Sequence, residues 1–278
     1  AYVSLRGAEP LQVNWGDDIN YHLLRLLTGR DVAIYFEQPL AVALRMKNYL
    51  CVGSTINYLT TSSTIVWGAG VIDDTLGLRA TPAAVTAVRG PLTREYLLSR
   101  GIDCPEVYGD PALLLPYWYS PPPLQRPRTG RVGIIPHYSD QNSQVLRRIQ
   151  SRFPDIQIID IVNYGLWTDF VDRICECDVV LSSSLHGLVV AEAYGIPSIW
   201  IRMSDNVIGK GFKFRDFYAS LGKMIKDPLT ISENSNPWEL ASSGAWSPGR
   251  LDLRTLLAAC PFDLKRPIYN EHSMDLSR

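Results

Sequence analysis

The stretch Leu181-Ser-Ser-Ser-Leu-His-Gly-Leu-Val-Val-Ala-Glu-Ala-Tyr-Gly-Ile-Pro-Ser-Ile-Trp-Ile201 decides the fold class of this chain. The apolar run over residues 178–181 predicts a short buried strand, residues 188–194 predict a helix that packs on a sheet, and residues 197–201 predict the next strand. A strand, turn, helix, strand unit of this kind is the building block of parallel sheets. We therefore expect an α/β protein.

His186 falls in the predicted turn between the strand and the helix of this unit. In open α/β sheets, ligands bind outside the carboxyl ends of strands, and the free N–H groups at the start of the following helix attract anions. Three serines and Gly187 surround the histidine with small residues. His186 is therefore a candidate functional residue. The alternative is a structural role, in which it caps the helix or binds a carbonyl group of the turn.

The same alternation of strands and helices occurs on both sides of a proline-rich segment, residues 116–128, which contains five prolines. Strands are predicted over residues 1–5, 31–35, 48–52, 64–67 and 83–88 before the segment, and over 131–136 and 156–160 after it. Helices are predicted over residues 19–27, 94–100, 142–151, 166–175 and 251–260. We expect two Rossmann-like domains that face a cleft, residues 1–126 and residues 127–278, with a poorly ordered tail at the end of the second.

The composition excludes several classes of protein. The 278 residues carry a formal net charge of −1, which offers no overall field to attract nucleic acid. The five cysteines are an odd number without a CxxC pattern, so we expect reduced thiols and no zinc site. The sequence shows no membrane-spanning stretch and no secretory leader. We expect a cytoplasmic protein, and peripheral association with the inner face of the membrane is compatible with this expectation.

Four motifs occur in an order typical of one enzyme family. They are the opening Asn14-Trp-Gly-Asp-Asp18, the segment 86–97 followed by Gly109-Asp-Pro-Ala112, the histidine unit, and Lys210-Gly-Phe-Lys-Phe-Arg-Asp-Phe-Tyr-Ala-Ser220. Over about residues 14–222 the chain resembles polysaccharide pyruvyl transferases. The family pattern usually has an arginine immediately before Leu-His-Gly, whereas this chain has Ser184.

The resemblance implies a fold similar to the two-domain GT-B glycosyltransferases, with the acceptor on the amino-terminal side and the donor on the carboxyl-terminal side. It also implies the activity: pyruvate moves from phosphoenolpyruvate onto a sugar of an exopolysaccharide or of its repeat-unit precursor. The product is a pyruvate ketal, and phosphate is released. The resemblance names neither the acceptor sugar nor the ketal position, and it leaves open whether the acceptor is lipid-linked.

Phosphoenolpyruvate carries a carboxylate and a phosphate, so its site needs convergent cations and backbone donors. Arg89 follows the predicted strand 83–88, and the family match makes it the expected anion clamp; an ion pair with a carboxylate such as Glu95 is the structural alternative. The basic segment 210–215 is either a phosphate-binding loop or solvated surface. The expected donor-binding residues are Arg89, Lys210, Lys213, Ser183, Ser184 and Gly187.

Ketal formation needs an acid that protonates the methylene carbon, and a histidine can supply that proton near neutral pH. We expect His186 to be this acid and Asp17 to be the carboxylate that orients or deprotonates the acceptor. The expected acceptor-binding residues are Asn14, Asp18 and His137. Helix capping is the alternative role for Asp17 and Asp18. Asp110, which precedes a proline, is expected to fix a turn. No metal and no redox cofactor are expected.

Two other functions remain open. A glycosyltransferase that uses a sugar nucleotide would explain Glu192-Ala-Tyr-Gly-Ile-Pro197, with Glu192 as the ribose contact. An inactive sugar-binding subunit of a polysaccharide assembly complex would explain Ser184. Trp15, Trp67 and Tyr138 are candidates for stacking on a sugar ring, although a place in the core is the more common outcome for tryptophan.

Overall fold

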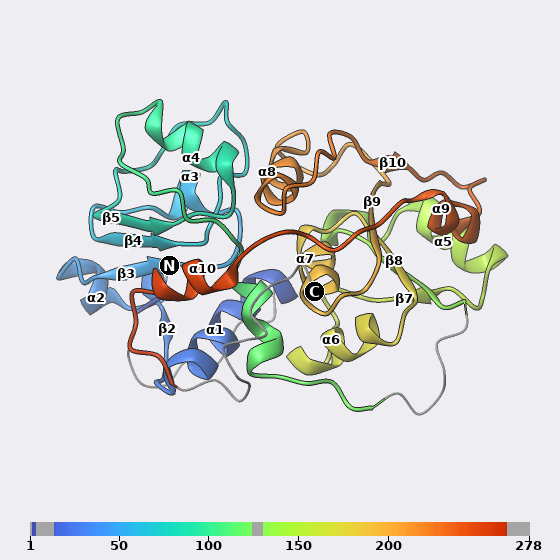
Figure 1. Ribbon diagram of the computed structural model, residues 1–278, viewed down its shortest axis with the longest axis horizontal. Coiled ribbons are helices and arrows are strands. Elements are labelled where there is room, and N and C mark those ends of the chain that lie inside the picture. Colours follow the sequence, from blue (N-terminus) through green and yellow to red (C-terminus); the bar gives the residue numbers. More distant parts are fainter. Residues whose placement is uncertain (1, 4–13, 124–129, 266–278) are drawn as a thin grey trace.

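The computed structural model describes residues 2–3, 14–123 and 130–265, and two five-stranded sheets form its frame (Figure 1). The first sheet has the order β2-β1-β3-β4-β5, with β1 (Tyr2–Val3), β2 (Ala33–Ile34), β3 (Asn48–Leu50), β4 (Thr64–Trp67) and β5 (Ala84–Ala87). The strands β3, β4 and β5 are parallel, and β1 pairs antiparallel with β2 and β3.

The second sheet is parallel throughout and has the order β10-β9-β8-β6-β7. Its strands are β6 (Val132–Ile135), β7 (Gln157–Ile158), β8 (Val179–Ser182), β9 (Ser198–Arg202) and β10 (Leu229–Thr230). The described chain is therefore an α/β protein with parallel sheets, as predicted. The histidine stretch supplies two neighbouring strands of this sheet, β8 and β9, and the helix between them.

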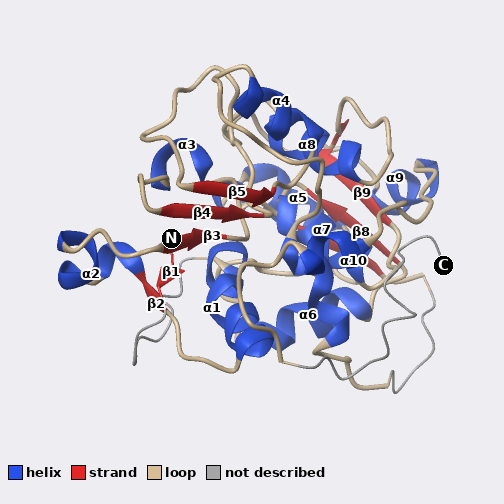
Figure 2. Cartoon of the chain, turned by 60° about the vertical axis from the view of Figure 1, so that its left-hand side comes forward, coloured by secondary structure: helices blue, strands red, loops and turns tan. Residues whose placement is uncertain are grey.

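Helices cover both sides of each sheet (Figure 2). The α-helices are α1 (Trp15–Thr28), α2 (Pro39–Ala43), α3 (Ile56–Leu59), α4 (Pro91–Leu98), α5 (Gln144–Arg152), α6 (Trp167–Cys175), α7 (Leu185–Ala193), α8 (Phe212–Ser220), α9 (Pro237–Ser243) and α10 (Leu253–Ala258). Three 3₁₀ helices, η1 (Tyr35–Glu37), η2 (Pro111–Tyr117) and η3 (Tyr138–Asp140), complete the described elements. No helix of these described ranges has the length and apolar character that a membrane crossing requires.

Three helices include residues that the sequence analysis placed in turns or loops, and each of these differences moves a candidate residue. The polar turn expected before residue 19 is the first turn of α1, because the side chain of Asn14 accepts the N–H of Asp17 and caps a helix that begins at Trp15. Helix α7 begins at Leu185, so His186 lies in its first turn and not in the preceding loop. The basic loop is shorter than predicted, because α8 begins at Phe212 after Gly211, whose φ is 80°.

The largest apolar core joins elements from the two sides of the proline-rich segment. The indole of Trp15 in α1 stacks on Phe170 in α6 at 4.8 Å, and its Nε1 donates to the carbonyl of Trp167 at 2.8 Å. Trp15 and Trp67 are both fully buried, so they are core residues and not exposed sugar platforms. All described strands of the first sheet precede the segment and all those of the second follow it. The predicted boundary at residue 126 lies outside the described residues, and the division stays a prediction.

The carboxyl-terminal segment returns to the first sheet (Figure 1). Trp67 Nε1 at the end of β4 donates to the carbonyl of Leu256 in α10 at 2.8 Å, and Lys265 N donates to the carbonyl of Leu27 at 2.7 Å. The predicted helix over 251–260 is therefore present, at Leu253–Ala258, and it packs on the first half of the chain. The tail predicted after it, residues 266–278, lies outside the described residues.

Candidate functional site

A cavity of about 280 Å³ lies where the two halves meet, beyond the carboxyl ends of β3, β6 and β8. This is the location at which parallel α/β sheets bind ligands. The start of α1, the loop after β3, the loop after β6, the start of α7 and one residue of α8 all contribute to it. Its lining residues are Asn14, Asp17, Gly53, Ser54, Thr55, Tyr58, Leu59, Ile72, His137, Tyr138, Ile161, Ser184, Leu185, His186 and Lys213.

His186 is held in this wall by the first turns of two helices. Its side chain is 11 % exposed, and its ring lies so close to Gly16 of α1 that a Cβ at that position would overlap Nδ1. Burial, and then the positive charges of Lys213 and Arg89, lower the pKa of His186 to about 3. The imidazole is therefore neutral at neutral pH while the cavity holds no anion.

Asp110 lies on the other side of the His186 ring. One carboxylate oxygen, Oδ1, accepts the N–H of Ala112 at 3.0 Å and caps η2, which is the structural role predicted from the sequence. The other oxygen, Oδ2, lies 3.8 Å from His186 Nε2, a relation that the sequence analysis missed. Asp110 is fully buried, and burial raises its pKa to about 7.

Lys213 brings a positive charge into the cavity wall from α8. Only 8 % of the residue is exposed, and its Nζ lies 3.4 Å from His137 Nε2. Burial, followed by the nearby charge of Arg89, lowers the pKa of Lys213 to about 8, while Asp17 opposes that shift. The pKa of His137 falls to about 3, mainly through burial and then through Lys213. At neutral pH the pair is an ammonium group beside a neutral imidazole.

The opening motif supplies two cavity residues, Asn14 and Asp17, which are hydrogen-bonded to each other. Asn14 Nδ2 donates to Asp17 Oδ2 at 2.5 Å, and burial raises the pKa of Asp17 although this bond and Lys213 oppose the shift. Asp18 is turned elsewhere: its Oδ2 accepts the hydroxyl of Tyr164 at 2.8 Å and so links α1 to the second half of the chain. Of the two aspartates, the structure brings Asp17 to the cavity.

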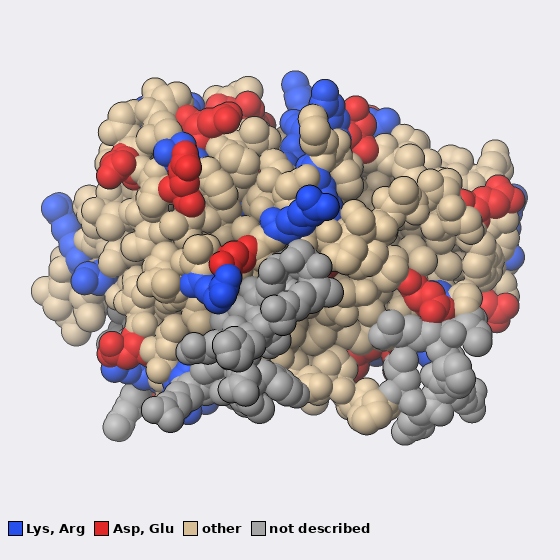
Figure 3. Space-filling model, viewed as in Figure 1, with Lys and Arg blue, Asp and Glu red and all other residues tan. Residues whose placement is uncertain are grey.

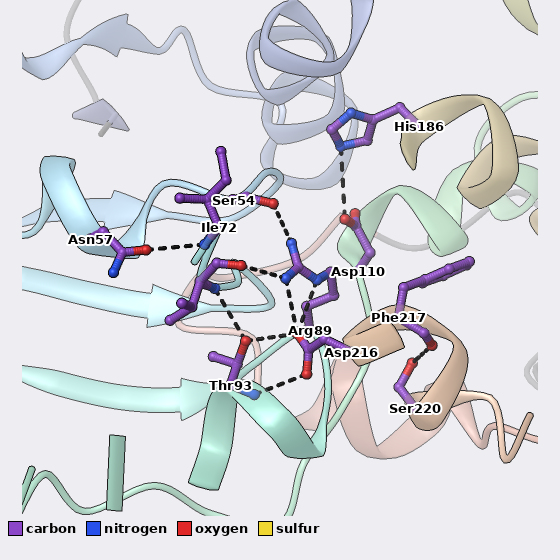
Figure 4. A network of polar contacts seen from close by, with 11 residues as sticks. Ser54, Asn57, Ile72, Arg89, Thr93, Asp110, His186, Asp216, Phe217 and Ser220 are labelled. Atoms are coloured by element: carbon purple, nitrogen blue, oxygen red, sulfur yellow. Dashed lines mark hydrogen bonds and ion pairs between the residues drawn. The ribbon is translucent and has the colours of Figure 1, made fainter. Parts of the chain in front are cut away.

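Arg89 is fully buried behind the cavity (Figure 4). Its Nε donates to Asp216 Oδ2 at 3.0 Å, Nη2 donates to the carbonyl of Val71 at 2.7 Å, and Nη1 donates to Ser54 Oγ at 2.5 Å. The ion pair considered for it is thus present, with Asp216 of α8 in place of Glu95. Ser54 lines the cavity, so Arg89 reaches the cavity through a hydroxyl group and through its charge.

Lys210 and Ser183 line a second cavity, of about 390 Å³, at the carboxyl end of β9 and the start of α8. Arg202 and Arg215 line it as well, and Figure 3 shows Lys and Arg side chains gathered over the α8 region. Gly187 lines neither cavity. It is buried in α7, where a Cβ would overlap Ser182 Oγ. The structure thus divides the predicted donor set. Lys213 and Ser184 line the first cavity, Lys210 and Ser183 line the second, and Arg89 and Gly187 are buried outside both.

Several cavity residues were not predicted, although one signal was available. Gly53, Ser54 and Thr55 follow the predicted strand 48–52, and therefore have the same position relative to a strand as His186 and His137. The contacts of Asp110 with His186 and of Asp216 with Arg89 have no local signal, because the partners are 76 and 127 residues apart and meet only through packing.

Glu192 is occupied by structural contacts. Its carboxylate accepts from Lys223 Nζ at 2.6 Å, from Trp246 Nε1 at 3.3 Å and from the N–H of Gly249 at 2.5 Å. The bonds from Trp246 and Gly249 fasten the segment after α9 onto α7, and the bond from Lys223 fastens the segment after α8 to the same helix. A ribose contact by Glu192 would have to compete with these three bonds.

The cavity wall therefore holds a buried ammonium group, two imidazoles and the carboxyl group of Asp17, and the carboxyl group of Asp110 lies behind His186. Both carboxyl groups have raised pKa values, and the set is suited to binding an anion and moving a proton. The sequence profile of the family described as polysaccharide pyruvyl transferase matches residues 14–205, which include the cavity residues from Asn14 to His186. The chain is 27% identical over 191 residues to "Uncharacterized protein L143" of Acanthamoeba polyphaga mimivirus, which is 63% of this chain and 64% of that protein. No solved structure matches the chain. The family match covers well over half of the sequence, and the chain belongs to the polysaccharide pyruvyl transferase family.

Proposed function

We propose that this protein transfers pyruvate from phosphoenolpyruvate onto a sugar of an exopolysaccharide or of its repeat-unit precursor, where it forms a ketal and phosphate is released. One observation carries the proposal: a single cavity contains a buried lysine, the family's histidine and an acidic side chain at the junction of the two halves. These are an anion-binding group, a proton-transfer group and a group that can orient a hydroxyl.

The donor binds at the start of α7 and beside Lys213. The N–H groups in the first turn of a helix have no partner within the helix, and they favour negative charge. Ser184 occupies the residue before that turn and lines the cavity, so a small side chain leaves the helix start open where the family pattern has an arginine. Lys213 supplies the missing charge from α8, while Arg89 adds positive potential and fixes Ser54. Ser183 and Gly187 support the turn, and Lys210 acts from the neighbouring cavity at the start of α8.

His186 protonates the methylene carbon of the donor, which leaves a cation at C2. One acceptor hydroxyl attacks C2 and loses its proton, and a second hydroxyl then displaces the phosphate, which leaves with that second proton. The first hydroxyl proton therefore replaces the proton that His186 gave to the methyl group. The second hydroxyl proton leaves with the phosphate. Asp17 orients the attacking hydroxyl, Asn14 and His137 contact the acceptor, and Asp18 holds α1 in place through Tyr164.

The proposal assigns the acceptor to the amino-terminal side and the donor to the carboxyl-terminal side. Two Rossmann-like domains, residues 1–126 and 127–278, would then resemble the GT-B arrangement. The separate parallel sheets and the cavity between them support this division. The two domains are firmly joined in this arrangement, because they share an apolar core and because α10 packs on the first sheet. The protein acts in the cytoplasm, where phosphoenolpyruvate is available.

The other two functions have less support. The contacts of Glu192 weigh against a ribose-binding role. An inactive sugar-binding subunit is favoured only by Ser184. The cavity buries His186 and Lys213 so deeply that the pKa of each is lowered, and binding of a neutral sugar does not need such buried ionisable groups. Sugar-nucleotide hydrolysis without phosphoenolpyruvate turnover would favour the first alternative, and sugar binding without any turnover would favour the second.

The test is phosphate release from phosphoenolpyruvate in the presence of saccharide acceptors, with the ketal identified in the product by mass spectrometry. His186→Gln should lower the rate about 10²- to 10⁴-fold, as expected for a missing general acid, and should leave donor binding in place. His272→Gln is the matched control for the loss of a histidine, because His272 lies outside residues 14–205, which the family profile matches, and the variant should leave the rate unchanged. A His186→Gln protein with more than about a tenth of the wild-type rate would contradict the assignment.

A further inference from the structure

Two buried polar atoms face each other without a hydrogen bond. Asp110 Oδ2 and His186 Nε2 are 3.8 Å apart, and neither has a hydrogen-bond partner among the residues that the structure describes. Native proteins rarely leave buried polar atoms unpaired, and those that persist call for an explanation, functional roles among them. Here a ring movement of less than about 1 Å would bring the two atoms to ordinary hydrogen-bond distance.

The carboxyl group is held in place, while the ring has charges on its other sides. Asp110 Oδ1 is fixed by the N–H of Ala112, so only Oδ2 can serve His186 (Figure 4). Lys213 of α8 and Arg89, after β5, act on the histidine electrostatically, and Arg89 also acts on Asp110. His137 faces the ring from the loop after β6, and Asp17 faces Lys213 from α1. The two cations oppose a third positive charge on the ring.

We propose that Asp110 is a positioning residue that stores the catalytic proton while the cavity is empty and passes it to His186 Nε2 when the anionic donor binds. The inference rests on the proposed function of the cavity and adds the source and control of the proton. In the unoccupied protein the carboxyl is protonated on Oδ2 and faces an unprotonated Nε2, which places the single ring proton on Nδ1. Burial raises the pKa of Asp110 and lowers that of His186, which favours this neutral pair.

Binding of the donor favours the charged form of the Asp110 and His186 pair, because the donor brings a phosphate and a carboxylate next to Lys213. Their negative charges offset the two cations that disfavour an imidazolium. The Oδ2–H bond breaks and an Nε2–H bond forms, which leaves a carboxylate paired with an imidazolium. The Nδ1–H proton then moves to the methylene carbon, the first acceptor hydroxyl returns a proton to Nδ1, and the Nε2 proton returns to Asp110 when the products leave. No other reactant is needed, and the acid is formed only when its substrate is present.

The variant Asp110→Asn tests this role without removing the cap. An asparagine still accepts the N–H of Ala112, since asparagine is as good an N-cap as aspartate. Its amide N–H would donate to Nε2 and hold the ring in its neutral form. We expect kcat to fall by about 10²-fold or more while the KM for phosphoenolpyruvate changes little. Asp172→Asn is the matched control, because Asp172 accepts the hydroxyl of Tyr119 away from the cavity and should keep the wild-type kcat.

A spectroscopic measurement on the wild-type protein covers the case in which the variant does not fold. The infrared difference spectrum on addition of phosphoenolpyruvate, or of inorganic phosphate, should show the loss of a protonated carboxyl band. The ¹⁵N resonance of His186 Nε2 should move to the protonated position in the same titration. A wild-type spectrum without either change, or an Asp110→Asn enzyme with normal kcat, would overturn the inference. These spectra need no acceptor, so absence of ketal formation would contradict only the proposed function.

Discussion

Lys213 is the residue in which burial and function are most directly linked. An exposed lysine keeps its charge up to about its ordinary pKa of 10.5, whereas burial lowers the pKa of Lys213 to about 8. Burial removes water from the ammonium group of Lys213, which lies beside the neutral imidazole of His137 and lines the open cavity. Such a group binds an anion strongly, because little water competes with the anion for its charge.

This pKa predicts a pH dependence of donor binding. Lys213 is protonated below about pH 8 and loses its charge above it, so the affinity for phosphoenolpyruvate should fall as the pH rises through that value. Lys213→Arg keeps its charge in alkaline solution, so whatever affinity it has should not fall in that range, whereas Lys213→Met should bind weakly throughout. Calorimetric titrations on either side of pH 8 measure this. A wild-type affinity that stays constant through that pH would show that the ammonium group does not contact the donor.

At the scale of elements, a buried network joins the end of β5 and the start of α4 to α8. Asp216 accepts bonds from Arg89, from the N–H of Thr93 at 2.9 Å and from the Thr93 hydroxyl at 2.7 Å. Because Lys213 lies one helical turn before Asp216, this network also sets the position of the cavity's cation. Arg89, which the sequence analysis assigned to donor binding, thus fixes the position of α8, the helix that carries Lys213.

Removal of one partner of this pair should cost more stability than removal of both. Arg89→Met or Asp216→Leu alone leaves a fully buried, uncompensated charge, for which the expected loss in the free energy of unfolding is about 3–5 kcal/mol. The double variant Arg89→Met with Asp216→Leu should lose clearly less than the sum of the two single losses. Urea unfolding of the four proteins measures the coupling, with the exposed pair Arg30 and Asp263 as a control that should show almost none. Additive losses at Arg89 and Asp216 would contradict the argument.

The sequence was most predictive where local pattern alone determines an element. The strand expected over 64–67 is β4 to the residue, and the strand expected over 131–136 contains β6. The starts of α1 and α7 were missed, because the polar residues after Asn14 and the serines before His186 are typical of loops as well as of first helical turns. The location of the cavity followed from strand ends. The contact partners of His186 and Arg89 could not be predicted in this way, because Asp110 and Asp216 reach them only through the tertiary fold.

At the scale of the whole molecule, the cavity depends on the contact between the two halves, and a second histidine helps to form that contact. The ring of His22 in α1 stacks against Trp167 at the start of α6, with centroids 5.8 Å apart. Burial, followed by the charge of Arg25, lowers the pKa of His22 to about 4. The folded protein therefore keeps neutral imidazoles at His22 and at His137, whereas the unfolded chain protonates both near the ordinary value of 6.5.

These shifts predict that, as the pH is lowered, the contact between the two halves weakens before most carboxylates are protonated. Between pH 6.5 and about 4 the unfolded chain binds more protons at His22 and His137 than the folded one, so the free energy of unfolding should fall as the pH is lowered through this range. His186 acts in the same direction, but Asp110 opposes it, because a carboxyl with its pKa raised to about 7 stabilises the fold as it takes up its proton.

The contributions of that pair largely offset each other, and the raised pKa of Asp17 opposes the two other histidines, so the fall in stability comes from His22 and His137. His22→Gln should therefore make the unfolding free energy less dependent on pH between about 6.5 and 4, and denaturant unfolding at a series of pH values measures the difference. His272→Gln, outside the described residues, is a control for the mere loss of a histidine. If the wild-type protein were equally stable at both ends of this range, the buried imidazoles would have to take up protons in the folded state, and the proton supply proposed for His186 would no longer need Asp110.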